Sequence, residues 1–350
     1  MSVLNILRGR VARRAVAVGG LAALAASVTG LALPPASAAA VPGAAKPAAL
    51  HVTSTSASLP GGSTASGFSE APDGAVYYAS GSSVYVVKGT KISLVLTASG
   101  RVLAVAANST GLFVEVGRTV TEYNSSNAIV RSWSLSGGHV PNSAGLFAVG
   151  SKLWAWTEYS TDESGLEYAS VYRFSASSGT VHRVSTADAY PGDFAADSDG
   201  AYYQQIGKGE SAHLVRVTSS GATRRIRNSA IGLQFALSGR RVEILAYHTS
   251  HSTSTLFIDS FSQTTLAHAY SRHVPASDRA IAGTGAGLLV LSAPCSSMAC
   301  SSATVSRLST ATGAKVSTLK LKDALLLVPG PAAAAITYHG GKYYLVRLAA

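Results

Sequence analysis

A short unit of three strands joined by tight turns recurs along this chain, and its first copy spans residues 67–98. Asp73-Gly74 predicts the opening turn of the unit, which is followed by a strand over 75–79. Gly81 and Lys88-Gly89 predict two further hairpin turns, because Gly between apolar runs supplies the backbone freedom that such turns need. The strands are rich in Val, Ile, Leu and Tyr, which suit a pleated surface that is at least half buried. One such unit cannot form a core alone, so its recurrence constrains the fold more than any other feature.

The pattern returns with a period of roughly 40 to 50 residues, which suits four-stranded repeats. The last copy contains only three strands, and we expect residues 50–55 to supply its outer strand and so leave no open sheet edge. A count of six is the alternative if 325–328 is only a connection, and a pair of all-β sandwiches is a third interpretation. The seven copies cover residues 67–98, 102–135, 144–186, 192–227, 231–274, 279–322 and 325–348.

Over residues 66–348 this pattern resembles the β-propeller superfamily, in a WD40-like or YVTN-like arrangement. The resemblance implies an all-β, seven-bladed β-propeller closed by an N-terminal strand. It is not specific to a family, because the Trp-Asp dipeptide of WD repeats and the Ser-x-Asp-x-Gly-x-Thr-Trp box of sialidases are absent. Trp133, Trp154 and Trp156 lie in predicted strands and are expected in the core.

The first 38 residues have the order of a secretory signal peptide: a basic start, an apolar run over 15–33 and a small-residue site at Ala36-Ser37-Ala38. We expect cleavage before Ala39 and no stable membrane insertion afterwards. An uncleaved membrane anchor is the alternative, and Arg13-Arg14 leaves twin-arginine export open. Residues 39–62 are expected to be a low-complexity linker that contains the possible closing strand, and 63–350 the propeller domain.

The chain has a formal net charge of +11, and removal of four arginines with the leader leaves +7, since no acidic residue precedes Glu70. Without a dense Lys/Arg block, nucleic acid is not an expected partner. A modest positive field outside the cell favours an anionic envelope polymer, a glycan or a protein partner, although charge for solubility alone explains it equally well. A monomer is expected.

The two cysteines, Cys295 and Cys300, are four residues apart in an exported chain, which predicts a disulfide bond that closes a loop. Neither Cys nor His stands close by to complete a metal site, so neither a metal nor a cofactor is expected.

The loop between the second and third strands is short in the first two copies and longer in the next four. In a propeller these loops share one face beside the central channel, so together they predict a binding wall. Catalysis at this face would require acidic and histidine side chains that lie close together, and their spacing in the sequence does not show whether they do. No catalytic residue is assigned. The candidate ligand-binding residues in and beside these loops are Tyr159, Asp162, Glu163, Glu167, Lys208, His248 and His251.

Three other patterns have simpler interpretations. The run from Asp193 to Gly200 resembles part of a calcium loop but lacks its final Glu, so a β-turn explains it better. The glycine-rich run 283–287 predicts a turn between strands, because no helix follows it. Arg224, Arg225 and Arg227 in a predicted outer strand either meet a polyanion or protect the strand edge from aggregation.

The sequence therefore predicts an exported, non-catalytic binding or scaffold propeller of the bacterial cell envelope or medium, with its ligand on the channel face. The alternative is a secreted lyase or hydrolase that acts on a glycan or peptide at the same face.

Overall fold

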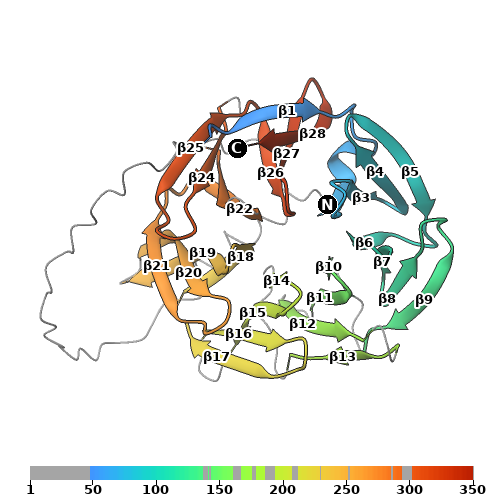
Figure 1. The fold of residues 1–350 in the computed structure, drawn as a ribbon, viewed down its shortest axis with the longest axis horizontal. Helices are drawn as coiled ribbons and strands as arrows, with labels where there is room; N and C mark the ends of the chain where they lie inside the picture. The colour runs from blue at the N-terminus through green and yellow to red at the C-terminus, as the bar shows by residue number, and fades with distance from the viewer. Residues whose placement is uncertain are drawn as a thin grey trace, which may run out of the picture.

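Alternating apolar residues and glycine turns fold into seven four-stranded antiparallel sheets, which follow one another around a ring (Figure 1). This computed structural model describes residues 48–349, except for 137–140, 142, 161–166, 176–178, 186–193, 207–211, 229, 251–252, 285–286 and 294–301. In each sheet one strand lies near the ring axis and the fourth forms the outer rim. The seven-bladed prediction is confirmed.

The first three blades follow a short 3-10 helix, η1 (Gly62–Thr64). Blade one consists of β2 (Ala65–Glu70), β3 (Val76–Ser80), β4 (Ser83–Lys88) and β5 (Lys91–Thr97). Blade two consists of β6 (Val102–Ala107), β7 (Leu112–Val116), β8 (Thr119–Tyr123) and β9 (Ile129–Ser134). Blade three consists of β10 (Ser143–Val149), β11 (Lys152–Ser160), β12 (Glu167–Phe174) and β13 (Val181–Arg183).

The next three blades repeat this order. Blade four consists of β14 (Ala195–Ala196), β15 (Gly200–Ile206), β16 (Ala212–Thr218) and β17 (Thr223–Arg227). Blade five consists of β18 (Ile231–Ser238), β19 (Arg241–Ser250), β20 (Thr253–Ser262) and β21 (His268–His273). Blade six consists of β22 (Asp278–Thr284), β23 (Gly287–Ser292), β24 (Thr304–Leu308) and β25 (Lys315–Lys320).

Blade seven combines strands from both ends of the described chain. It contains β26 (Ala324–Val328), β27 (Ala333–His339), β28 (Lys342–Ala349) and β1 (His51–Thr55). β1 pairs antiparallel with β28, with His51 opposite Ala349 and Thr55 opposite Val346. The stretch 324–328 is thus a paired strand and not a connection.

The core lies in the seams where blades pack face to face, and each seam has its own cluster of buried apolar side chains. Between blades three and four, for example, Trp154 and Trp156 pack with Tyr203. Burying one large apolar side chain stabilises a fold by about 1.5–3 kcal/mol, so the seams supply most of the stability. Trp133, Trp154 and Trp156 are all buried, as the sequence predicts.

The innermost strands approach one another closely enough to require glycine. A Cβ on Gly283 of β22 would lie 1.5 Å from the carbonyl oxygen of Leu237 on β18. The glycine-rich run joins β22 to β23, as predicted, and Thr284 pairs with Gly287 at the ends of the two strands; residues 285–286 lie outside the described ranges.

One predicted loop is wrong. The polar run 249–254 reads as a long loop, but β19 and β20 continue through it, with Thr249 opposite Ser254 and Ser250 opposite Thr253. Backbone pairing does not require apolar side chains, so a polar hairpin end can extend beyond the core.

Within the described ranges, no helix has the length and apolar character needed to cross a membrane.

Candidate functional site

Of the predicted ligand-binding residues, His248 is the one whose side chain the structure describes. It lies on β19, in the seam between blades four and five. Tyr159 is the penultimate residue of β11 and Glu167 is the first residue of β12, but the side chains of both lie outside the part of the chain that the structure describes. The remaining predicted residues fall outside the described ranges, so their convergence stays a prediction: Asp162, Glu163, Lys208 and His251, together with the disulfide pair Cys295 and Cys300.

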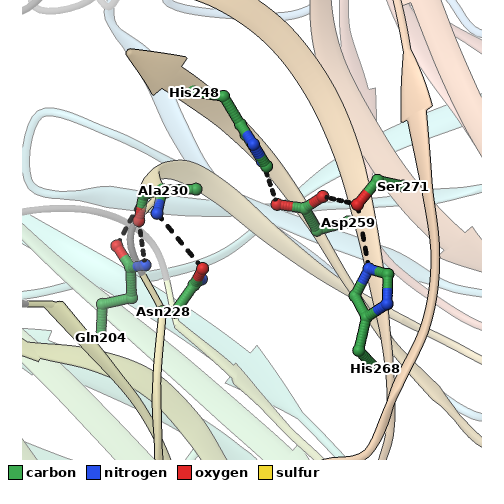
Figure 2. Close-up of polar contacts among 8 residues, drawn as sticks. Gln204, Asn228, Ala230, His248, Asp259, His268 and Ser271 are labelled. Atoms are coloured by element: carbon green, nitrogen blue, oxygen red, sulfur yellow. Dashed lines mark hydrogen bonds and ion pairs between the residues drawn. The ribbon is translucent and has the colours of Figure 1, made fainter. Parts of the chain in front are cut away.

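His248 belongs to a chain of polar contacts across the sheet of blade five (Figure 2). Its Nε2 lies 2.6 Å from Oδ2 of Asp259, and Ser271 donates from Oγ to Oδ1 of the same carboxylate over 2.6 Å. Nε2 of His268 lies 2.9 Å from the Ser271 hydroxyl. The Asp259 carboxylate is only 2% exposed, whereas the His248 side chain is 36% exposed. A buried acid is thus held by two partners that reach it from neighbouring strands.

The order of this chain differs from that of a hydrolytic triad. In a triad the histidine stands between serine and aspartate and takes the serine proton. Here Asp259 stands between Ser271 and His248. Because a hydroxyl has one proton and Ser271 gives it to Asp259, Nε2 of His268 must act as donor. With Ser271 as donor to Asp259, neither histidine accepts the serine proton, and the contacts of Asp259 with His248 and Ser271 join β19, β20 and β21.

Beside it, an amide side chain fixes the connection from blade four to blade five (Figure 2). Gln204 of β15 donates to the carbonyl oxygen of Ala230 over 2.8 Å and accepts from the Gly232 amide over 2.7 Å. Asn228 accepts from the Ala230 amide over 3.2 Å. These contacts satisfy buried backbone groups that no sheet partner reaches.

Arginines near the ends of the third or fourth strands tie one blade to the next. Arg173 donates to the carbonyl oxygen of Ser219 in blade four over 2.8 Å, and Arg216 to that of Thr264 in blade five over 3.2 Å. We call the full set the inter-blade arginines; they are Arg173, Arg216, Arg272, Arg307 and Arg347.

The seam between blades seven and one contains an ion pair. Arg347 of β28 donates to Glu70 of β2 over 2.6 Å and also contacts the carbonyl oxygen of Gly74. The second carboxylate oxygen of Glu70 accepts from the Ala332 amide over 2.9 Å. Burial raises the pKa of the Glu70 carboxyl, and the contacts with Ala332 and Arg347 oppose that rise. The pair joins residues 277 positions apart, so it holds the ring together at the junction of its two ends.

Two other buried acids, Glu243 and Glu115, have a raised side-chain pKa. Burial raises the pKa of Glu243 to about 7, although hydrogen bonds from Ser260 and Tyr270 oppose this. Burial also raises the pKa of Glu115 well above its ordinary value. Neither carboxyl oxygen of Glu115 has a hydrogen-bond partner. Perturbed acids often mark functional sites, but these two lie within seams, away from solvent.

The outer strands divide the rim into two sectors (Figure 1). Consecutive outer strands β17, β21 and β25 form what we call the basic rim, whose Lys and Arg residues are Arg224, Arg225, Arg227, Arg272, Lys315 and Lys320. Outer strands β1, β5 and β9 form the apolar rim, whose exposed large apolar side chains are Val52, Leu94, Ile129 and Val130. Arg224, Arg225 and Arg227 are all exposed on β17, as predicted for an outer strand.

The described residues contain no group of three or more His, Cys, Asp or Glu side chains that could hold a metal ion. The suspected calcium-loop fragment is a turn, where Asp197 accepts from the amides of Asp199 and Gly200 over 2.8 and 2.9 Å. Asp193 lies outside the described ranges.

Sequence reasoning missed the inter-blade arginines, although a signal for them exists. In three blades the arginine is followed by an apolar residue and then Ser or Thr, near the end of the third strand. The three matches are 173–175, 216–218 and 307–309. Because these residues recur at the same place in the repeat, alignment of the copies would have found them.

No protein-family model matches this chain, and no curated protein matches it in sequence. Solved structures resemble it in fold. BBS1N in complex with ARL6DN is 11% identical with a TM-score of 0.54, covering 85% of this chain and 96% of that one. A chain of the mitotic checkpoint complex is 12% identical with a TM-score of 0.58, covering 93% and 99%. The Pan2 WD40 domain of Neurospora crassa is 9% identical with a TM-score of 0.56, covering 85% and 95%. At such identities the likeness concerns architecture alone, and together with the seven sheets it identifies the chain as a seven-bladed β-propeller with a WD40-like fold.

Proposed function

We propose that this chain is an exported binding or scaffold module of the bacterial cell envelope or medium, and that it holds its ligand without catalysis. The fold supports a binding role, because a propeller presents loops and strand edges on a rigid ring. Two of its structural neighbours, BBS1N and the checkpoint chain, come from protein complexes, which supports a protein partner at a coarse level. The order of basic, apolar and small residues in the first 38 positions supports export.

The observation that carries the non-catalytic assignment is the geometry of the blade-five polar chain. It brings together Ser271, Asp259 and two histidines, the residue types of hydrolytic sites, yet the contacts of Asp259 with His248 and Ser271 tie three neighbouring strands together. The serine donates its proton to the carboxylate and not to a histidine. We place the primary ligand on the face that carries the connections between second and third strands.

Thermal unfolding of the exported protein tests the binding role. Its Tm would be measured with anionic polymers, neutral glycans and divalent metals, at low and high salt. A ligand at 100 times its Kd stabilises the native state by about 2.7 kcal/mol, so we expect a rise in Tm with at least one polymer or glycan. No shift with any polymer or glycan contradicts a role in binding envelope polymers, and release of cleaved product favours the lyase or hydrolase.

Mass spectrometry of the protein recovered outside the cytoplasm tests export. We expect a mature N-terminus at Ala39 and a mass two hydrogens below that of the reduced chain, as a Cys295–Cys300 disulfide requires. A chain that keeps Met1 contradicts cleavage, and two free thiols contradict the disulfide.

A further inference from the structure

The outer strands of the seven blades carry charge of a single sign. They contain nine Lys or Arg residues and four His residues, but no Asp or Glu. Six of the nine lie on β17, β21 and β25, the basic rim. Surfaces that serve solubility alone usually mix both signs, so one-sided charge here calls for a different explanation.

Most of the acidic side chains that the structure describes are buried inside the ring. Eight of the seventeen Asp and Glu residues are buried, whereas Arg307 is the one buried Lys or Arg among the residues that the structure describes. These acids are Glu70, Glu115, Glu122, Glu158, Glu243, Asp259, Asp278 and Asp323. The exterior is therefore more positive than the net charge of the chain indicates.

The fold itself accounts for only part of the basic rim. Arg272 is an inter-blade arginine and contacts the carbonyl oxygen of Gly313, so its role is structural. Arg224 and Arg227 are exposed and form no ion pair with a described carboxylate. Lys320 is likewise exposed on β25. These side chains are available to an external ligand.

Positive charge also continues from β17 towards blade three. Burial raises the pKa of Tyr203 to about 12, while the nearby Arg225 and Arg183 oppose that rise. Both guanidinium groups thus lie close to one tyrosine, although they come from the outer strands of different blades.

Protection of strand edges does not require so many charges. An edge can be kept from pairing by one Lys or by a short strand, and β5 and β9 each carry a single Lys or Arg. By contrast, β17 carries three arginines in five residues. Arginine binds phosphate and carboxylate groups through two parallel hydrogen bonds, which lysine cannot form.

We propose that the basic rim is a second binding surface, on which a linear anionic polymer lies across blades four to six. The ligand carries repeated phosphodiester or carboxylate groups, and Arg224 and Arg227 are its principal contacts. This inference rests on the proposed binding function, but it places a ligand at the rim and not over the channel.

Binding of the full exported chain to fluorescently labelled polymers tests the proposal. Poly(glycerol phosphate) supplies phosphodiesters, polygalacturonate supplies carboxylates, and dextran is the neutral control. R224T/R227T removes two rim charges, and Thr keeps β-propensity at exposed strand positions. The matched control, K88T/K91T, removes the same charge from exposed positions beside the apolar rim.

With at least one anionic polymer, we expect R224T/R227T to weaken binding by about 10- to 30-fold. The slope of log Kd against the logarithm of salt concentration should decrease by about one to two. The Kd of K88T/K91T for the polymer should stay within about twofold of that of the unaltered protein. R224K/R227K restores the charge without the guanidinium geometry, so this variant should recover part of the lost affinity. An unchanged Tm for both double variants shows that neither result reflects misfolding.

Equal weakening by the two double variants would overturn the proposal, because overall charge would then explain binding. Unchanged affinity in R224T/R227T would also overturn it. If the unaltered protein binds neither anionic polymer but its Tm rises with a neutral glycan, the rim proposal fails while the binding function stands. If nothing in the panel binds, the rim proposal fails together with the role in binding envelope polymers.

Discussion

The basic rim and the apolar rim are built on the same backbone pattern, yet they present opposite surfaces. β17 and β9 are both outermost strands of their blades (Figure 1). β17 exposes three arginines, whereas β9 exposes Ile129 and Val130. Both strands close a four-stranded blade, and both have a buried apolar seam beneath them. The exposed side chains of these outer strands are therefore free of the packing constraints that act on the seams, and their differences can reflect what each sector meets outside.

The seams beneath the two sectors differ as well. Beneath the apolar rim, Arg347 pairs with a buried carboxylate at the junction of blades seven and one. Beneath the basic rim, Arg216 is partly exposed and donates to uncharged groups, the carbonyl oxygen of Thr264 and the Tyr202 side chain. We therefore expect Arg347 to contribute more to folding stability than Arg216.

The largest expected effect distinguishes these two arginines. R347A leaves Glu70 buried without its charge partner, so we expect the free energy of unfolding to fall by about 3–5 kcal/mol. R216A removes hydrogen bonds to two uncharged partners, the Thr264 carbonyl oxygen and the Tyr202 side chain, and the expected loss is about 1–2 kcal/mol. Urea denaturation of both variants measures the difference. Equal losses would show that the ion pair adds nothing at the junction, and the contrast between the two seams would disappear.

Glu243, on the face of blade five that packs against blade six, makes stability depend on pH. Its pKa rises from 4.5 to about 7 on folding, so between these values the folded state holds more protons than the unfolded chain. Its contribution is therefore complete below pH 4.5 and is lost as pH rises through 7, a change of about 3 kcal/mol.

E243Q should remove this component, so the stability difference between E243Q and the unaltered protein should vary with pH over that window. Urea denaturation from pH 4 to 8 provides the measurement. A constant difference across the series would show that Glu243 does not titrate with a raised pKa.

Glu115 lies in the seam between blades two and three, with no hydrogen-bond partner for its carboxyl group. E115L replaces an unsatisfied polar group by an apolar one of similar size, so we expect a gain of about 1–3 kcal/mol at pH 7. Thermal and urea denaturation check this. A loss of stability would mean that the carboxyl has a role in the seam, and E115Q would then separate hydrogen bonding from charge.

The smallest expected effect tests whether rim side chains are unimportant for folding. L94K/I129K places charges on the apolar rim, and both original side chains are more than half exposed, at 56% and 65%. We expect a stability change within about 0.5 kcal/mol, together with lower binding of a hydrophobic dye. A loss above 2 kcal/mol would show that the apolar rim belongs to the core, and its comparison with the basic rim would no longer hold.

Much of the fold followed from local patterns, but the candidate site did not. Turn glycines and alternating apolar residues predicted the blades, because each hairpin depends on neighbours in sequence. The run 249–254 was misassigned because its polar residues resemble a loop, whereas the pairing of Thr249 with Ser254 depends on backbone hydrogen bonds. His248 was identified as a candidate, but its partner Asp259 was not, since they lie on different strands of a twisted sheet.

By itself, the sequence predicted the all-β class, seven blades in preference to six, the use of residues 50–55 in the last blade, and the burial of the three tryptophans, since local propensity, periodicity and the need to cover an open edge indicate these properties. Only the tertiary structure decided which groups meet across seams, such as Glu70 with Arg347, and which acids the ring encloses. These contacts join residues far apart in the chain, and they form only when the ring brings its two ends together. Long-range electrostatics and burial depend on that geometry, which no local pattern encodes.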